Sequence, residues 1–217
     1  AGARPRFHAL GVGTPILLPL LSILGDRRTF TAVDSTAPIL DAWSSLTVSL
    51  YVERPAPMKL KAHRIAEVWL SGGPGWTCSC SACAAFSRSH PPRITAARSW
   101  WRGEGRRSLI AQDLRAPSPL ADLLPLLGNP SDAVVSREAG MARIAHNHWV
   151  LQRLVAAAQA NSASTARLRG WADDVVGRYV ESSADANWRA AVTEAWRIAE
   201  SVSAQLRDAK PGGEVAA

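Results

Sequence analysis

The chain has few cysteines, and all three lie in one short stretch, Cys78-Ser-Cys-Ser-Ala-Cys83. The sequence therefore lacks the distant cysteine pairs whose cross-links stabilise small secreted domains. Three thiolates at C-x-C-x-x-C spacing are instead typical of a metal site, because soft sulfur ligands suit Zn²⁺ in tetrahedral geometry. We expect a metal-binding cluster and a reducing, cytoplasmic setting.

The sequence also lacks an apolar run long enough to cross a bilayer. The longest such run, residues 9–24, is interrupted by Gly11, Gly13, Pro15 and Pro19. It falls short of the ~20 apolar residues that a spanning helix needs. We expect neither a membrane-spanning segment nor a secretory signal.

The composition excludes a disordered chain, because 47% of the residues are hydrophobic and nine are Trp. Lys and Arg outnumber Asp and Glu by 25 to 18, which gives a formal net charge of +7. A basic surface suits a polyanion such as nucleic acid, although inert basic surfaces are also common. A globular domain, or part of a larger one, is therefore expected.

The N-terminal part shows a strand, helix, strand pattern. Residues 6–12 are typical of a buried strand, and a helix is expected from Pro15 to Gly25 with Thr14 as its N-cap. A second strand over residues 29–33 follows it. This order predicts a parallel sheet and places Asp34 at the carboxyl end of the second strand, the edge where a (β/α)₈ barrel carries its catalytic groups.

The middle of the chain changes in character twice. Residues 46–53 and 64–70 predict two strands of a small antiparallel addition. Residues 87–140 are rich in Arg, Pro and Ser. Within them, Arg98, Arg102, Arg106 and Arg107 lie beside two tryptophans and could follow a phosphate backbone, the alternative being a solvated loop with core tryptophans.

The C-terminal third is predicted to be helical from Arg143 onward. Two further amphipathic helices are expected over residues 165–182 and 186–208. The three C-terminal helices together should form a small bundle around Trp171, Trp188 and Trp196.

A closed metal site needs a fourth ligand beside the three cysteines. The chain offers five histidines: His8, His63, His90, His146 and His148. We favour His146, because it lies near the start of the predicted helix, a rigid place from which a ring nitrogen can be aimed at a metal. The alternative is three reduced, partly buried thiols with His146 on the surface, and an iron–sulfur cluster is disfavoured because it normally takes four cysteines.

Four stretches carry a family resemblance: "HALGVGTP", a strand ending in "DS", "CSCSAC", and a helix with "AHNHWVLQRLV". In order and content they resemble the C-terminal part of the tRNA-guanine transglycosylases, the family of the queuosine and archaeosine enzymes and of relatives that insert 7-deazaguanines into DNA. The resemblance implies that Cys78, Cys80, Cys83 and His146 hold a structural Zn²⁺, with Asp34 at the nucleophile position. It also implies a pentosyltransferase that exchanges guanine for a 7-deazaguanine in tRNA or DNA.

The chain departs from the family in two respects. The segment between Cys83 and His146 is longer than usual, which keeps His90 and His148 open as ligands. The base-recognition motifs of the family lie on strands that this chain does not contain, so we expect an N-terminal half or a partner subunit to supply them. A non-catalytic zinc-stabilised nucleic-acid-binding subunit is the alternative function.

The expected fold class is α/β, the C-terminal portion of a TIM barrel with an inserted zinc-binding subdomain and a helical C-terminal segment. The expected parts are the last βαβ units (1–45), a zinc-binding subdomain with a basic insertion at about 87–140 (46–160), a helical extension (161–209) and a disordered tail (210–217).

Overall fold

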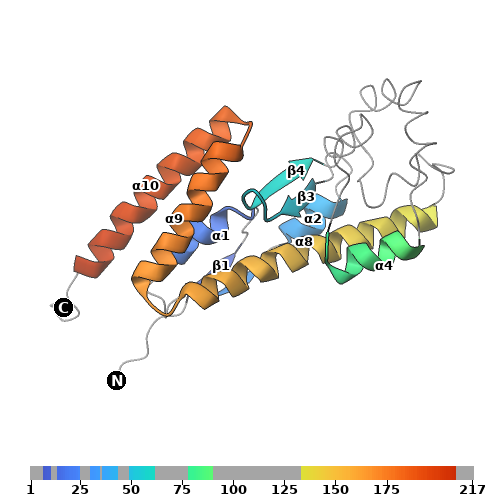
Figure 1. Cartoon of the computed structure of the whole chain (residues 1–217), viewed down its shortest axis with the longest axis horizontal. Helices are drawn as coiled ribbons and strands as arrows, with labels where there is room; N and C mark the ends of the chain where they lie inside the picture. Colours follow the sequence, from blue (N-terminus) through green and yellow to red (C-terminus); the bar gives the residue numbers. More distant parts are fainter. Residues whose placement is uncertain are drawn as a thin grey trace, which may run out of the picture. The chain divides into compact units, whose positions relative to one another are not determined.

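The computed structural model describes residues 7–10, 14–24, 30–34, 36–43, 49–61, 78–89 and 133–208 (Figure 1). The chain divides into two compact units. The first comprises residues 1–35, 53–57 and 153–217, and the second comprises residues 36–52 and 58–152.

The first unit begins with the predicted strand, helix, strand order. Strand β1 (Phe7–Leu10), helix α1 (Leu17–Ser22) and strand β2 (Phe30–Asp34) follow one another, and β1 pairs with β2 in parallel. Leu10 lies opposite Asp34, which is the last residue of β2. The position of Asp34 at the carboxyl end of a parallel strand is therefore confirmed.

The start of α1 differs from its prediction. Ile16, and not Thr14, holds the N-cap position. Thr14 contributes its backbone carbonyl, which accepts from the Leu17 N–H. Pro19 falls within the first turn of α1, where the missing N–H has no helical partner to lose.

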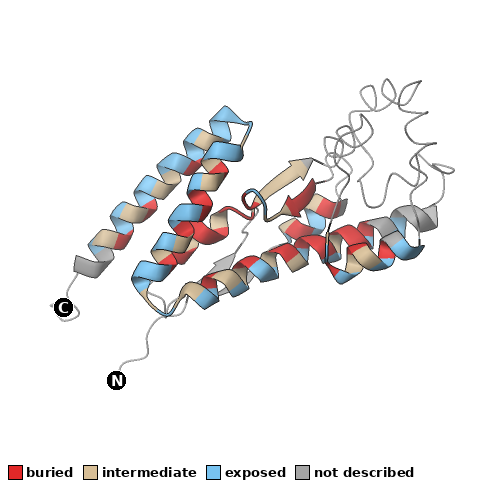
Figure 2. Ribbon diagram, viewed as in Figure 1, coloured by how far each residue is buried: buried red, intermediate tan, exposed pale blue. Residues whose placement is uncertain are grey.

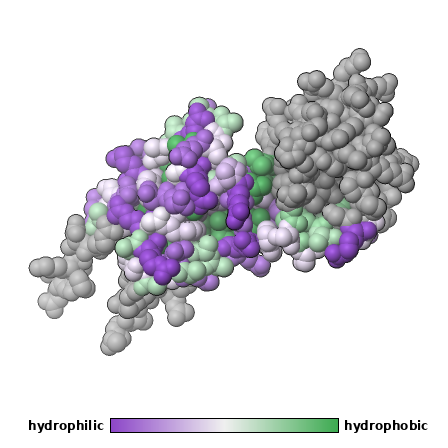
Figure 3. All heavy atoms as spheres, viewed as in Figure 1, coloured by the Kyte–Doolittle hydropathy of each residue, from purple (hydrophilic) through white to green (hydrophobic). Residues whose placement is uncertain are grey.

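Helices α9 (Thr165–Ser182) and α10 (Ala186–Asp208) complete the first unit and have the predicted bounds. Helix α1 packs on both of them, because it presents the buried side chains Leu18 and Leu20. A buried cluster joins the three helices and is flanked by the half-buried Trp171 and Trp196; its members are Ile23, Ala172 and Ala199. Figure 3 shows many hydrophilic side chains on the visible face of α9 and α10.

The prediction that Trp188 lies inside the bundle is wrong. Its side chain is 48% exposed, near the start of α10. The buried face of α10 is formed by Val192, Ala199 and Ser203. Trp188 lies on the same side of the helix, four residues before Val192, but in the first turn, where the residues of α10 are still largely exposed.

The second unit contains helix α2 (Ala37–Trp43), strands β3 (Ser49–Val52) and β4 (Met58–Lys61), helix α4 (Ser81–Ser89) and most of helix α8 (Ala133–Asn161). Strands β3 and β4 are antiparallel, with Tyr51 opposite Lys59. Strand β3 lies within the first predicted strand, residues 46–53, but its partner β4 lies between the two predicted strands and not in the second. The strand predicted at residues 64–70 lies outside the described residues.

Helix α8 begins at Ala133 and not at Arg143, so His146 lies in its interior. The helical pattern that starts at Arg143 is the amphipathic part of a longer helix. Buried residues concentrate where α4, β3 and α8 meet and where α1 meets α9 (Figure 2).

The strands of the described residues form two separate two-stranded sheets, and a closed barrel is not among them. The (β/α)₈ architecture therefore stays a prediction. No helix in the described part of the chain is both long and apolar enough to cross a membrane.

Candidate metal centre

The three cysteines and His146 come together in one small cluster. The ligand atoms, three Sγ and one imidazole nitrogen, all lie within 4.8 Å of one another. Cys80, Cys83 and His146 are buried, and Cys78 is partly exposed. The cluster could hold a metal ion.

The cysteines are positioned by the start of helix α4. The Cys80 carbonyl accepts from the Ala84 N–H, and the Cys80 Sγ accepts from the Cys83 N–H at 3.3 Å. Cys80 therefore acts as the N-cap of α4, with sulfur in the place where Ser or Asp oxygen is usual. The Cys80 N–H in turn donates to the Cys78 Sγ at 3.4 Å. These N–H donors and the positive end of the helix favour thiolates.

His146 approaches the sulfurs from helix α8. Its Nδ1 lies 3.3 Å from the Sγ of Cys78, 3.7 Å from that of Cys80 and 3.4 Å from that of Cys83. Its other nitrogen, Nε2, lies 2.8 Å from the Tyr51 carbonyl oxygen. A carbonyl can only accept, so Nε2 carries the proton and Nδ1 turns a lone pair toward the sulfurs in the neutral ring.

The distances fit a tetrahedral ion better than a hydrogen-bonded group. Zn–S and Zn–N bonds of about 2.3 and 2.0 Å at tetrahedral angles place N and S about 3.5 Å apart. The three observed Nδ1···Sγ distances, 3.3 to 3.7 Å, bracket that value. The single lone pair of the His146 Nδ1 cannot accept hydrogen bonds from three thiols at once, whereas a cation at the centre could bind the nitrogen and all three sulfurs.

The electrostatics of the cluster also call for a cation. A hydrogen bond from Cys83, assisted by His146, lowers the pKa of the Cys78 thiol to about 4, against the opposing effect of burial. Burial raises the pKa of Cys80, and the hydrogen bond to Cys78, together with burial, raises that of Cys83. Cys78 is thus the most readily ionised of the three, and a divalent cation would favour the thiolate form of all three.

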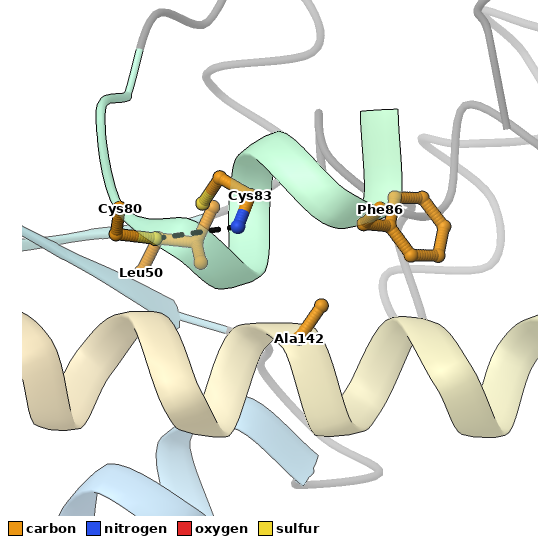
Figure 4. Close-up of a cluster of buried hydrophobic side chains, with 5 residues drawn as sticks. All are labelled: Leu50, Cys80, Cys83, Phe86 and Ala142. Carbon is orange, nitrogen blue, oxygen red and sulfur yellow. Dashed lines mark hydrogen bonds between the residues drawn. The ribbon is translucent and has the colours of Figure 1, made fainter. Parts of the chain in front are cut away.

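Buried apolar side chains pack against two of the cysteines. Leu50 of β3, Phe86 of α4 and Ala142 of α8 pack with Cys80 and Cys83 in one buried cluster (Figure 4). The half-buried Trp149, whose ring centroid lies 6.2 Å from that of His146, packs against it. This packing holds α4 and α8 together around the ligands.

The structure decides between the histidines that it describes. His146 is 2% exposed and faces the cysteines, whereas His148 is exposed. Residues two apart on a helix point to nearly opposite sides, so α8 can offer only one of them. The alternative that placed His146 on the surface is wrong. His90 lies outside the described residues.

The other predicted site residues are placed only in part. Asp34 ends strand β2 in the first unit, and the metal cluster lies in the second. The proposed nucleic-acid contacts lie outside the described residues: Arg98, Arg102, Arg106 and Arg107.

Sequence reasoning assigned no role to the groups that support His146, although Asn147 belongs to the His-Asn stretch of the family resemblance. The Tyr51 backbone and the fully buried Asn147 surround it, and Arg143 donates from Nε to the Ala42 carbonyl at 2.9 Å. The signal that could have identified Asn147 was its place beside the candidate ligand. The backbone of Tyr51 carries no sequence signal.

Comparison of the chain with protein-family models, with curated proteins and with solved structures finds no match.

Proposed function

We propose that this chain is the C-terminal part of a base-exchanging transglycosylase, of the type that replaces guanine by a 7-deazaguanine in tRNA or DNA. The observation that carries the proposal is the convergence of three cysteine sulfurs and the Nδ1 of one histidine in a closed cluster. These are the residues of the C-x-C-x-x-C and His-Asn stretches on which the resemblance rests.

The ion of this proposal is Zn²⁺, because a Cys₃His donor set at tetrahedral spacing suits it best. Cys78, Cys80, Cys83 and His146 would hold it. Four protein ligands leave no open position for water, so the ion supplies a cross-link and takes no part in the reaction. It would join the start of α4 to the middle of α8, which are separated by a long stretch of chain.

Asp34 is the proposed nucleophile. Its support is its place at the carboxyl end of a strand in a parallel pair, where such groups are found in barrel enzymes. Its carboxylate would attack C1′ of the target nucleotide, forming a C1′–O bond while the bond from C1′ to guanine N9 breaks and guanine leaves with a proton. The incoming 7-deazaguanine would give up its N9 proton, bond to C1′ and release the carboxylate.

The reaction also needs a barrel, groups that bind the base and contacts to the nucleic acid, which other parts of the protein would supply. The parallel β1–α1–β2 unit would be the last part of a (β/α)₈ barrel. The groups that bind the base and move its proton would come from an N-terminal half or a partner subunit. The basic run from Arg98 to Arg107 would contact the phosphates of the nucleic acid, and the target base would be turned out of its stack.

The test is guanine exchange by the complex isolated through a tag on this chain. The complex is given tRNA or duplex DNA together with radiolabelled guanine, and label in the nucleic acid is measured. We expect incorporation that Asp34→Asn abolishes, while the matched control Asp173→Asn, at an exposed position of α9, retains it. Absence of incorporation with the unaltered complex on both acceptors would contradict the proposal.

A second candidate function is a non-catalytic zinc-stabilised subunit that binds nucleic acid beside a catalytic chain. The four-ligand set supports this function as well as it supports the transglycosylase, because a site with four protein ligands is structural and performs no chemistry. The net charge of +7 also suits a polyanion such as nucleic acid. Exchange that persists at full rate in Asp34→Asn would select this function.

A further inference from the structure

Two neighbouring residues of α8 bind the same strand residue. The Asn147 Oδ1 accepts from the Tyr51 N–H at 2.8 Å, and the His146 Nε2 donates to the Tyr51 carbonyl at 2.8 Å. The N–H and C=O of one strand residue point to the same edge of the strand. Helix α8 therefore lies along the edge of β3 that faces away from β4 and is attached to it at two adjacent points.

The carboxamide of Asn147 makes two further bonds. Its Nδ2 donates to the Ser49 carbonyl at 3.1 Å and to the Pro38 carbonyl at 3.3 Å. The side chain is fully buried, and its single carbonyl and both of its N–H groups have partners. A group satisfied in this way has one orientation only, because a flipped amide would turn its N–H groups toward the Tyr51 N–H and its oxygen toward two carbonyls.

The two contacts to β3 reproduce those of a neighbouring strand. A residue of a parallel strand donates its N–H to one carbonyl and accepts, with its own C=O, from the N–H two residues further along. The Asn147 side chain does the same with the Ser49 carbonyl and the Tyr51 N–H. A single side chain thus closes the edge of β3 and fixes its register with α8.

We propose that Asn147 is a positioning residue of the metal centre: it sets the register of α8 on β3 and thereby aims both nitrogens of His146. With Asn147 seated, the adjacent His146 directs Nε2 at the Tyr51 carbonyl and Nδ1 at the three sulfurs. Groups of this kind, which orient a ligand without touching the ion, typically change metal affinity 10–100-fold when they are removed. The inference rests on the metal centre of the proposed function but not on its catalytic activity.

The test is Co²⁺ binding to the metal-free chain, because the visible spectrum of Co²⁺ reports both the number of thiolates and the geometry of the site. The probe is Asn147→Leu, which keeps the approximate shape of the side chain and removes its three hydrogen bonds. The matched control is Asn161→Leu on the same helix, since the Asn161 Nδ2 donates only within the helix end, to the Ala157 carbonyl at 2.8 Å. Affinity is measured by competition with a chelator.

We expect Asn147→Leu to bind Co²⁺ about 10–100-fold more weakly than the unaltered chain, with an altered spectrum at saturation. Asn161→Leu should match the unaltered chain in both respects. Unchanged affinity and spectrum in Asn147→Leu would overturn the inference and leave Asn147 a purely structural residue. If the unaltered chain bound neither Co²⁺ nor Zn²⁺, the metal centre of the proposed function would itself fail, which is a different result.

A measurement on the unaltered protein covers the case in which Asn147→Leu does not fold. Linkage is reciprocal, so if the Asn147 contacts strengthen metal binding, metal binding must strengthen those contacts. Hydrogen exchange of the Tyr51 amide should therefore slow about 10–100-fold when Zn²⁺ is added. Exchange at the same rate with and without Zn²⁺ would overturn the inference.

Discussion

At the scale of single residues, His146 divides its two ring nitrogens between the fold and the metal cluster. Nε2 donates to the Tyr51 carbonyl, which fixes the ring and its tautomer, and Nδ1 faces the sulfurs. The Tyr51 side chain is fixed from its other end, since its hydroxyl donates to Asp41 Oδ2 at 2.5 Å and Lys59 Nζ lies 2.8 Å from the same oxygen. Burial and the hydrogen bond to Asp41 raise the pKa of Tyr51, so it stays a neutral donor at any ordinary pH.

Metal binding should release about two protons per ion near pH 7. The pKa of Cys78 is lowered to about 4, so it is already a thiolate, whereas the raised pKa values of Cys80 and Cys83 keep both protonated until the ion arrives. The affinity for Zn²⁺ should therefore rise with pH and fall as acid protonates the sulfurs. Calorimetry of Zn²⁺ binding in two buffers of different ionisation enthalpy gives the proton count. A count near zero would show that all three sulfurs are thiolates before binding.

Leu50 should be among the most sensitive positions of the second unit. Its side chain is 0% exposed and packs against Cys80, Cys83 and Phe86, so Leu50→Ala leaves a cavity beside the ligands. We expect a loss of about 2–5 kcal/mol in the free energy of unfolding, measured by urea denaturation of the metal-loaded protein. The control is Leu40→Ala, at a position 62% exposed, which should stay within about 0.5 kcal/mol of the parent. Equal effects of the two substitutions would contradict the packing.

At the scale of elements, helix α8 connects α2, β3 and α4 within the second unit. Arg143 and Asn147 are four residues apart on one face and bond the carbonyls of Ala42 and Pro38 in α2. The Arg143 cation thereby meets the last turn of α2, where the negative end of the helix dipole favours it. His146, on the adjacent face, turns toward the three cysteines at and before the start of α4. One helix thus sets the positions of three other elements.

The start of α9 depends on one side chain. The Ser164 Oγ accepts from the Arg167 N–H at 3.2 Å, which satisfies one of the free donors of the first turn. Ser164→Ala should lower the free energy of unfolding by about 1 kcal/mol, as measured by urea denaturation. Ser182→Ala at the other end of α9 is the control, because its hydroxyl donates to the Arg178 carbonyl, which is already in the helical ladder. A cap role for Ser164 is excluded if the two variants are equally stable.

At the scale of the whole chain, the candidate ligands all belong to one of the two compact units. Cys78, Cys80, Cys83 and His146 lie in the second unit, and the packed helices α1, α9 and α10 lie in the first. Structural metal sites contribute their binding free energy to the folding of the segment that holds them. The two units should therefore respond differently to removal of the metal.

Chelation should loosen the second unit and leave the first largely intact. We expect amide hydrogen exchange to rise in α4 and in the part of α8 around His146, while α9 and α10 keep their protection, as measured by mass spectrometry with and without a chelator. His146→Ala is the control, because a protein without the site should show the same exchange in both conditions. Uniform loss of protection across both units would mean that the chain unfolds as one body.

The sequence by itself determined the elements that depend on local signals. Residues 165–182 and 186–208 were predicted as helices with the bounds of α9 and α10, since an amphipathic period and helix-forming residues suffice there. The strand, helix, strand order and the place of Asp34 at the end of β2 followed in the same way. The spacing of the cysteines was enough to predict a metal cluster, because it is a chemical pattern within six residues.

Only the tertiary structure decided how distant residues meet. His146 and His148 lie two positions apart in sequence, and the packing of α8 on β3 and α4 determines which of them faces the thiols. Strand β4 forms in an unpromising segment because its backbone pairs with β3. Trp188 is exposed although it shares a helix face with the buried Val192, because it lies in the first turn of α10, before the buried part of the helix begins. The role of Asn147 also depends on a strand about a hundred residues earlier in the chain. Local preference cannot encode such contacts, since their free energy exists only once the segments are side by side.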